Sequence, residues 1–105
     1  MANTGIGCTV VAFLRAKPGK RDELRQVLEG FVAPTRAEEG CINYDLHVSD
    51  DDPDLFVFYE NWRSKQDLEQ HLRKPHLVPL HERGAELLAG EPEIRLVTML
   101  SPYGR

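Results

Sequence analysis

Three of the four histidines in the chain follow one aromatic segment, and their side chains could carry acid-base chemistry. The segment, residues 55–62, is mostly apolar and ends on Glu60-Asn61-Trp62. Imidazoles and carboxylates exchange protons near neutral pH, and aromatic rings stack on flat ligands. The stretch from residue 55 to residue 88 therefore predicts proton transfer on an aromatic molecule. Its histidines are His71, His76 and His81.

Helical spacing indicates which of these histidines face inward. His71 comes three residues after Leu68, and His81 comes four residues after Leu77, so we expect both on the buried stripe of their helices. His76 lies at the junction between the two helical pieces. A histidine on an apolar face is usually a core residue bonded to a backbone group, so the structural and the chemical interpretations both stay open.

The spacing of the histidines argues against a metal site. The steps from His71 to His76 and from His76 to His81 are both five residues, which places neighbours well apart around a helix. The sequence has no HExxH motif and no closely paired cysteines. It also lacks the glycine-rich motifs of nucleotide sites and the nucleophile elbow of hydrolases. We therefore expect neither a metal nor another cofactor.

Composition bounds the class of protein. Of 105 residues, 41% are hydrophobic and 29% are charged, as expected for one globular domain over residues 1–105. A net charge of −4 argues against a nucleic-acid partner. No apolar run approaches the ~20 residues of a membrane span, and the N-terminus lacks the features of a signal peptide. With only Cys8 and Cys41, we expect a reduced, cytoplasmic protein without a membrane partner.

Apolar segments between breaker residues predict four strands and two helical units. The strands are expected at residues 8–16, 41–49, 55–62 and 93–100. The order β-α-β-β-α-β is that of the ferredoxin-like α+β fold with a four-stranded antiparallel sheet. Helices would cover one face of this sheet, whereas the other face still carries apolar residues. We expect that face to pack on the same face of a second copy, which gives a homodimer.

Proline positions divide the helical units. The first helix should run from residue 22 to residue 39, bent or interrupted at Pro34 because proline lacks an amide hydrogen. The second unit should begin at the capping residue Ser64, with Leu68 and Leu72 on its buried stripe. Pro75 should end this piece and begin the next, since proline is favoured at the first position of a helix.

Three short runs together resemble the antibiotic biosynthesis monooxygenase domain, in particular its quinol-monooxygenase members. They are residues 39–45 (EGCINYD), 56–62 (FVFYENW) and 71–77 (HLRKPHL). The resemblance covers about residues 8–100. It implies a ferredoxin-like protomer that forms a dimeric α+β barrel, with a pocket between the sheet and the helices of each subunit.

The resemblance also implies a reaction. Some family members oxidise quinols or anthrone-like polyketides with molecular oxygen and without flavin, metal or haem; a base deprotonates the phenolic substrate, and the resulting carbanion reacts with oxygen. Trp62 matches a pocket tryptophan of the polyketide-oxidising members, but Phe58 stands where those have asparagine. In the haem-degrading branch the iron-ligating histidine aligns with His81, but His71 and Ala12 replace its tryptophan and asparagine. Haem degradation is therefore not expected.

These observations favour a cofactor-independent monooxygenase that oxidises a quinol or polycyclic phenol. His71 is the expected general base, and His81 is a secondary acid-base candidate. The alternative is a non-catalytic protein of the same fold that binds an aromatic metabolite or haem. In either case the residues expected to contact the ligand are Phe58, Tyr59, Glu60, Trp62 and His76.

Overall fold

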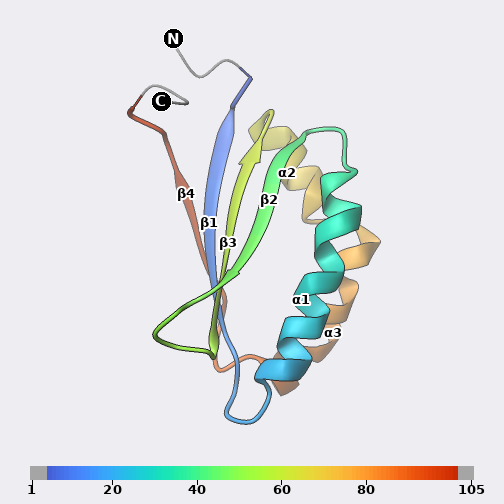
Figure 1. The fold of residues 1–105 in the computed structure, drawn as a ribbon. Coiled ribbons are helices and arrows are strands. Elements are labelled where there is room, and N and C mark those ends of the chain that lie inside the picture. The colour runs from blue at the N-terminus through green and yellow to red at the C-terminus, as the bar shows by residue number, and fades with distance from the viewer. Residues whose placement is uncertain (1–4, 102–105) are drawn as a thin grey trace.

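The computed structural model describes residues 5–101. Its four strands form one antiparallel sheet in the order β2-β3-β1-β4. The helices all lie on one side of this sheet (Figure 1). This arrangement confirms the predicted ferredoxin-like α+β fold. The elements are β1 (Cys8–Arg15), α1 (Arg21–Arg36), β2 (Cys41–Val48), β3 (Leu55–Trp62), α2 (Lys65–His71), the 3-10 helix η1 (Pro75–Leu77), α3 (Val78–Leu87) and β4 (Glu93–Val97).

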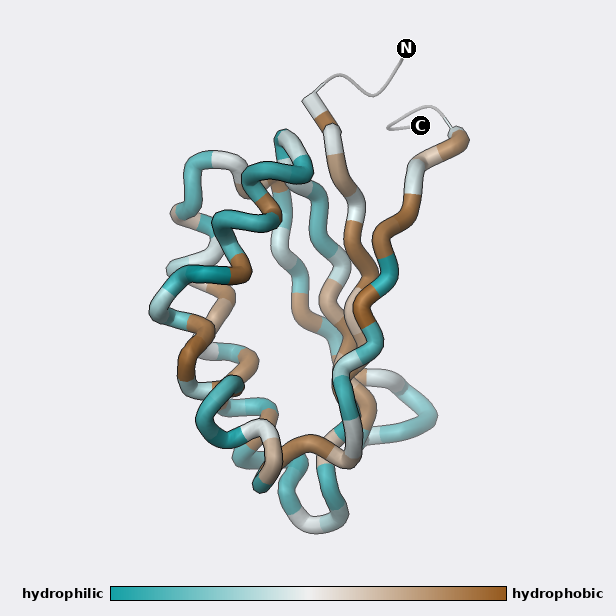
Figure 2. Tube along the Cα trace, turned by 180° about the vertical axis from the view of Figure 1, so that it is seen from behind, coloured by the Kyte–Doolittle hydropathy of each residue, from teal (hydrophilic) through white to brown (hydrophobic). Residues whose placement is uncertain are grey.

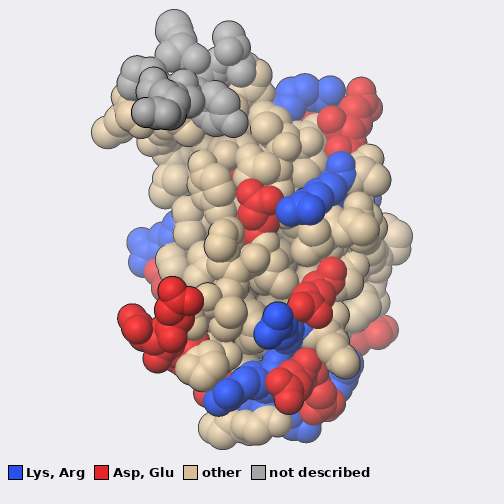
Figure 3. All heavy atoms as spheres, in the orientation of Figure 1, with Lys and Arg blue, Asp and Glu red and all other residues tan. Residues whose placement is uncertain are grey.

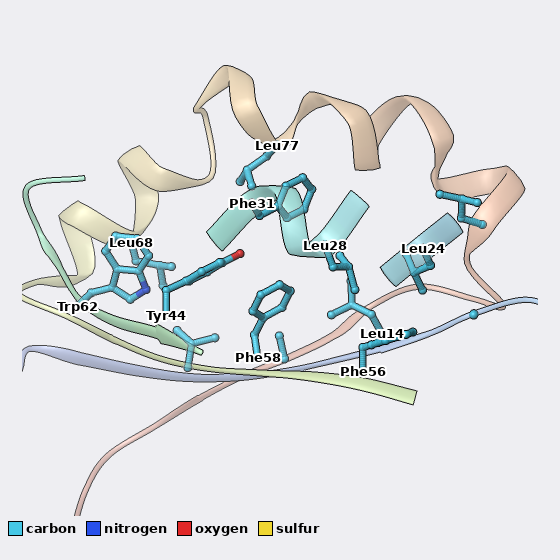
Figure 4. Close-up of a cluster of buried hydrophobic side chains, with 14 of the residues drawn as sticks. Leu14, Leu24, Leu28, Phe31, Tyr44, Phe56, Phe58, Trp62, Leu68 and Leu77 are labelled. Carbon is cyan, nitrogen blue, oxygen red and sulfur yellow. The ribbon is translucent and has the colours of Figure 1, made fainter. Parts of the chain in front are cut away.

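The helix-facing side of the sheet carries the core. Successive side chains of a strand point to opposite faces, so every second residue of β1 and β3 is buried under the helices. In β3 this row contains Phe56, Phe58, Glu60 and Trp62. Leucines and phenylalanine of α1 pack onto it from above (Figure 4). Glu60 is thus a carboxyl group in an otherwise apolar row, 5% exposed.

The opposite face of the sheet has no helix over it within residues 5–101 (Figure 1). Its central side chains are Val11, Phe13 and Val57, all half-buried, and Tyr59, which is 38% exposed. Phe13 and Val57 are direct partners across β1 and β3. In Figure 2 the β1 and β4 strands stand clear of the helical layer, with hydrophobic stretches along both. An apolar sheet face of this kind is expected to bind another surface.

Helix α1 ends earlier than predicted. It continues through Pro34, which lies in its last turn and costs only one backbone hydrogen bond there. The amide of Ala37 then bonds the carbonyl of Ala33, and the amide of Glu38 bonds that of Thr35. These bonds close the last turn, so the prediction of a helix to residue 39 was wrong. Glu38 lies in the turn that leads to β2, facing α2 and η1 rather than following the helix.

The second helical unit is in two pieces, as predicted. Ser64 caps α2, because its Oγ accepts a hydrogen bond from the amide of Asp67 at 3.1 Å. The chain turns after His71, and Lys74 has the extended backbone expected before Pro75. Leu72 falls in this turn and is 49% exposed, so the prediction that it is buried was wrong. The fourth strand stops at Val97, three residues short of the predicted end.

The surface carries both signs of charge side by side. Basic and acidic side chains alternate over the face in Figure 3. Many of them form exposed ion pairs, such as Arg83 with Glu23 at 2.8 Å and Arg63 with Asp67 at 2.9 Å. Exposed pairs of this kind contribute little stability each. No helix within residues 5–101 is long and apolar enough to cross a membrane.

Candidate active site

A cavity of about 640 Å³ lies between the sheet and the helices. Its apolar wall includes leucines of η1 and α3, alanine and leucine of β1 and the aromatic ring of Phe58. Five polar side chains also line it. Tyr44 from β2, Glu60 from β3 and His71 from α2 form one group, and His81 of α3 and Glu91 are the other two. Tyr44 and Glu60 are cross-strand partners, and the rings of Tyr44 and His71 lie 5.4 Å apart. The cavity therefore combines apolar walls with one group of polar side chains.

His71 is held on two sides. Its ring packs at a tilt against Trp62, with the ring centres 4.6 Å apart, and its Nδ1 lies 2.8 Å from Oε2 of Glu38. Since the carboxylate can only accept, Nδ1 donates the hydrogen, and the neutral ring keeps a free electron pair on Nε2. Burial lowers the pKa of His71 below its ordinary value of 6.5, although Glu38 opposes this shift. The site therefore favours a neutral imidazole, which can accept a proton.

Glu38 joins two histidines. Besides His71, its Oε2 lies 3.0 Å from Nε2 of His76, and that nitrogen lies 3.1 Å from Oγ1 of Thr35. The side chain of Glu38 is only 9% exposed. Sequence reasoning missed Glu38 as a site residue, because its contact with His71 spans 33 positions and it lies in a turn with no periodic pattern. Tyr44, which also lines the cavity, was not among the predicted site residues.

Glu60 and Trp62 form a second buried pair. The indole Nε1 donates a hydrogen bond to Oε1 of Glu60 at 2.9 Å. Burial raises the pKa of Glu60 to about 7, and the bond from Trp62 limits the increase. Burial is the main cause that raises the pKa of Tyr44 well above its ordinary range, and the nearby charge of Glu60 raises it further. Near neutral pH the cavity thus has a carboxyl group that exchanges between donor and acceptor.

Six of the seven predicted residues lie in or beside the cavity. Phe58, Glu60, His71 and His81 line its wall. Trp62 is fully buried behind His71 and supports both His71 and Glu60 without reaching the cavity wall. His76 lies behind Glu38 and is 20% exposed. Figure 4 shows the side chains of Trp62, Tyr44 and Phe58 one after another along the sheet, beneath the helices.

One predicted residue, Tyr59, lies away from the cavity, and another, His81, is more exposed than expected. Tyr59 points to the helix-free face of the sheet, because its neighbours in β3 point into the core and side chains alternate along a strand. His81 lines the cavity together with Leu77 and Gly84, which agrees with its predicted helical phase, but its side chain is exposed rather than buried.

The histidine spacing was also interpreted wrongly. Steps of five residues would separate His71 from His76 on one continuous helix, but the chain turns between them. Their rings lie 6.1 Å apart, and Glu38 contacts both. His81 is not part of this group and lies on the cavity side of α3. Two imidazoles and one carboxylate, rather than three imidazoles, therefore come together.

The chain is similar to known proteins of one family. Residues 8–83 match the model of the family described as antibiotic biosynthesis monooxygenase. The chain is 38% identical to Rv0793 of Mycobacterium tuberculosis over 93 residues, which cover 89% of this chain and 88% of that protein. The solved structure of Rv0793 superposes on it with a TM-score of 0.84 and 32% identity, covering 92% of this chain and 98% of that one.

Two further relatives match over smaller shares of the two chains. The Escherichia coli protein named probable quinol monooxygenase YgiN is 35% identical over 85 residues, which cover 70% of this chain and 81% of YgiN. The uncharacterized protein sll1783 of Synechocystis is 31% identical over 87 residues. Those residues are 83% of this chain, but the chain spans only 59% of the length of sll1783.

Proposed function

Because this chain belongs to the antibiotic biosynthesis monooxygenase family, we propose that it oxidises a quinol or polycyclic phenol with molecular oxygen. The single observation that carries this proposal is the position of His71. A neutral imidazole lines a largely apolar cavity, and the carboxylate of Glu38 fixes the hydrogen on its far nitrogen. This is the arrangement that general-base catalysis needs, since the base must be unprotonated and oriented.

The cavity supports an aromatic substrate. A volume of about 640 Å³ is within the usual range for small-molecule sites. Its walls are mainly leucine and alanine side chains with the ring of Phe58, against which a flat ring can pack. A hydroxyl group of the substrate would lie by Tyr44, Glu60 and His71, where it finds both an acceptor and a donor. The Escherichia coli relative YgiN is named a probable quinol monooxygenase, which agrees with this substrate class.

The proposed reaction needs no group beyond the substrate, oxygen and the protein. His71 takes the proton of a phenolic hydroxyl, and negative charge is delocalised onto a ring carbon. That carbon gives electrons to molecular oxygen and forms a carbon–oxygen bond. Loss of water then leaves a hydroxyquinone from a quinol, so one oxygen atom enters the product and the other leaves as water. Glu60, protonated in part near pH 7, can return a proton to the departing oxygen.

The proposal includes a homodimer. The helix-free face of the sheet carries Val11, Phe13 and Val57 in a row with the exposed Tyr59. Packing the same face of a second copy against it would bury these side chains and leave each cavity on the outer, helical side of its own sheet. The cavity and the proposed interface therefore use opposite faces and do not compete for residues.

Oxygen consumption by chelator-treated protein tests this proposal. A panel of benzoquinols, naphthoquinols and anthrones would be assayed with and without protein, and products formed under ¹⁸O₂ would be analysed by mass spectrometry. We expect protein-dependent oxygen uptake with at least one compound and a product that has gained one labelled oxygen atom. The absence of protein-dependent uptake across the panel would contradict the proposal.

A further inference from the structure

We propose that Glu38, His71 and His76 form a binding site for a divalent ion of the Zn²⁺ class, and that an ion bound there prevents His71 from acting as a base. Binding of the ion is inferred from the geometry alone, whereas its inhibition of His71 rests on the proposed function. Among residues 5–101, these three side chains are the one group of at least three candidate ligands whose donor atoms meet.

The donor atoms are already close to the spacing of a coordination shell. Each residue offers one atom, and all three atoms lie within 4.8 Å of one another. Oε2 of Glu38 is 2.8 Å from Nδ1 of His71 and 3.0 Å from Nε2 of His76. Tetrahedral zinc with bonds near 2.0 to 2.1 Å places neighbouring ligand atoms about 3.3 Å apart. Small side-chain rotations therefore suffice to receive the ion.

The charge of the cluster also favours a cation. The ion pairs of Glu38 within the described chain are with the two histidines alone, and the carboxylate is 9% exposed. When both imidazoles are neutral, the cluster holds one negative charge in a largely buried place. An unpaired buried charge costs free energy, and a divalent ion would offset it.

The ligand set selects the kind of ion. Two imidazole nitrogens and one carboxylate oxygen are typical of zinc and ferrous sites, whereas magnesium and calcium prefer oxygen ligands. The hydroxyl of Thr35, 3.1 Å from the ligating nitrogen of His76, could hydrogen-bond a water molecule in the fourth position. His76, at 20% exposure, gives the ion a route from solvent that does not pass through the cavity.

Metal binding would change the tautomer of His71. Without the ion, the hydrogen is on Nδ1, bonded to Glu38, and Nε2 carries the free electron pair. An ion that binds Nδ1 uses the electron pair there, so the hydrogen of the neutral ring moves to Nε2. The ring then has no free pair and cannot accept a proton from a substrate. The ion would thus act as an inhibitor rather than as a cofactor.

Binding is tested with the full-length protein and metal salts alone. Zn²⁺ would be titrated by calorimetry, and Co²⁺ by its visible absorption, which is strong for four-coordinate sites. We expect saturable binding of one ion per chain in the native protein. His76→Gln and Glu38→Gln should each weaken it by on the order of 100-fold, because each removes a ligand. His81→Gln and His47→Gln, which change exposed histidines outside the cluster, should leave it unchanged.

The effect on His71 is tested separately from turnover. Nitrogen NMR of the histidine rings should show His71 protonated on Nδ1 in chelator-treated protein and on Nε2 after one equivalent of Zn²⁺. Failure of the native protein to bind one ion, or equal affinity in His76→Gln, would overturn the site. Binding without the change of tautomer would overturn the inhibitory half. Oxygen uptake by the chelator-treated protein is a different measurement, so its failure would count against the proposed function alone.

Discussion

At the scale of single residues, the pKa values of two groups that line the cavity, His71 and Glu60, are shifted in opposite directions. Burial lowers the pKa of His71 and raises that of Glu60 to about 7, because the charged form of each loses solvation. At neutral pH this favours an unprotonated imidazole beside a carboxyl group that is partly protonated. Environments that move the pKa values of two groups apart in this way are typical of paired bases and acids in enzymes.

The indole of Trp62 should control the pKa of Glu60. Its Nε1 donates to Oε1 of the carboxylate and stabilises the charged form. Trp62→Phe keeps an aromatic ring but removes this donor, so we expect the pKa of Glu60 to rise further above its ordinary value. Carbon NMR of the glutamate carboxyl groups during a pH titration would measure it. A value that stays at about 7 or falls would show that the indole does not stabilise the carboxylate.

Glu60 should also make the folded state less stable at high pH. The folded pKa of about 7 exceeds the ordinary 4.5, so the folded state binds more protons between these values. This contribution is fully present below pH 4.5 and is lost as the pH rises through 7. Glu60→Gln lacks the ionisation and should be more stable than the native protein by roughly 3 kcal/mol at pH 8, but not at pH 4.5.

Urea unfolding of both proteins at pH 4.5 and pH 8 measures this difference directly. Comparing variant with native protein removes the contributions of other titrating groups, including His71, whose lowered pKa acts in the opposite direction. An equal free-energy difference at the two pH values would contradict the raised pKa of Glu60.

Strand alternation made part of the site predictable. Phe58, Glu60 and Trp62 share one face of β3, and that face proved to be the one under the helices. The same alternation places Tyr59 on the other face, so its assignment to the pocket ignored the pattern of its own strand. Glu38 could not be found in this way, because its role depends on a turn and on a partner in another helix.

At the scale of elements, the site depends on how α2 begins and ends. Its seven residues are too few for a helix to be stable alone. Ser64 caps the first turn, and the last residue, His71, is held by Glu38 from the turn between α1 and β2. The turn after His71 then brings η1 back so that His76 meets the same carboxylate. Helical periodicity could not predict this meeting, since it assumes an unbroken helix.

Loss of the cap should therefore destabilise the protein. Ser64→Ala removes the acceptor for the amide of Asp67 and should lower the free energy of unfolding by about 1 kcal/mol. Ser64→Thr keeps a hydroxyl and is the matched control, with most of the stability retained. Thermal and urea unfolding would compare the three proteins. Equal stability of Ser64→Ala and the native protein would mean that the cap does not hold α2.

At the scale of the whole molecule, the fold separates two surfaces. The order of elements along the sequence predicts the ferredoxin-like topology, because four strands and two helical units in this order have few ways to pack. The helices cover the cavity side, and the apolar row of Val11, Phe13 and Val57 stays open. The spacing of the residues alone could not indicate the size of the cavity, which depends on side chains from all four strands.

A charge in the open face should break the proposed dimer. Val57 lies in the middle of this face between Phe13 and His47. Val57→Glu would bury an unpaired carboxylate at the interface, so we expect a dimer of the native protein and a monomer of the variant at micromolar concentration. Gln26→Glu adds the same charge on the exposed side of α1 and should remain dimeric. Analytical ultracentrifugation measures both; a monomeric native protein would contradict the interface.

The central claim is that His71, oriented by Glu38, removes the proton that starts oxidation in the cavity. The most direct measurement is the rate of oxygen uptake by chelator-treated native protein, His71→Gln and His47→Gln with a quinol that the native protein oxidises. We expect His71→Gln to lower kcat/KM by about 100-fold or more, while His47→Gln, an exposed histidine outside the cavity, leaves it unchanged. Equal rates for His71→Gln and the native protein would contradict the assignment of His71 as the base.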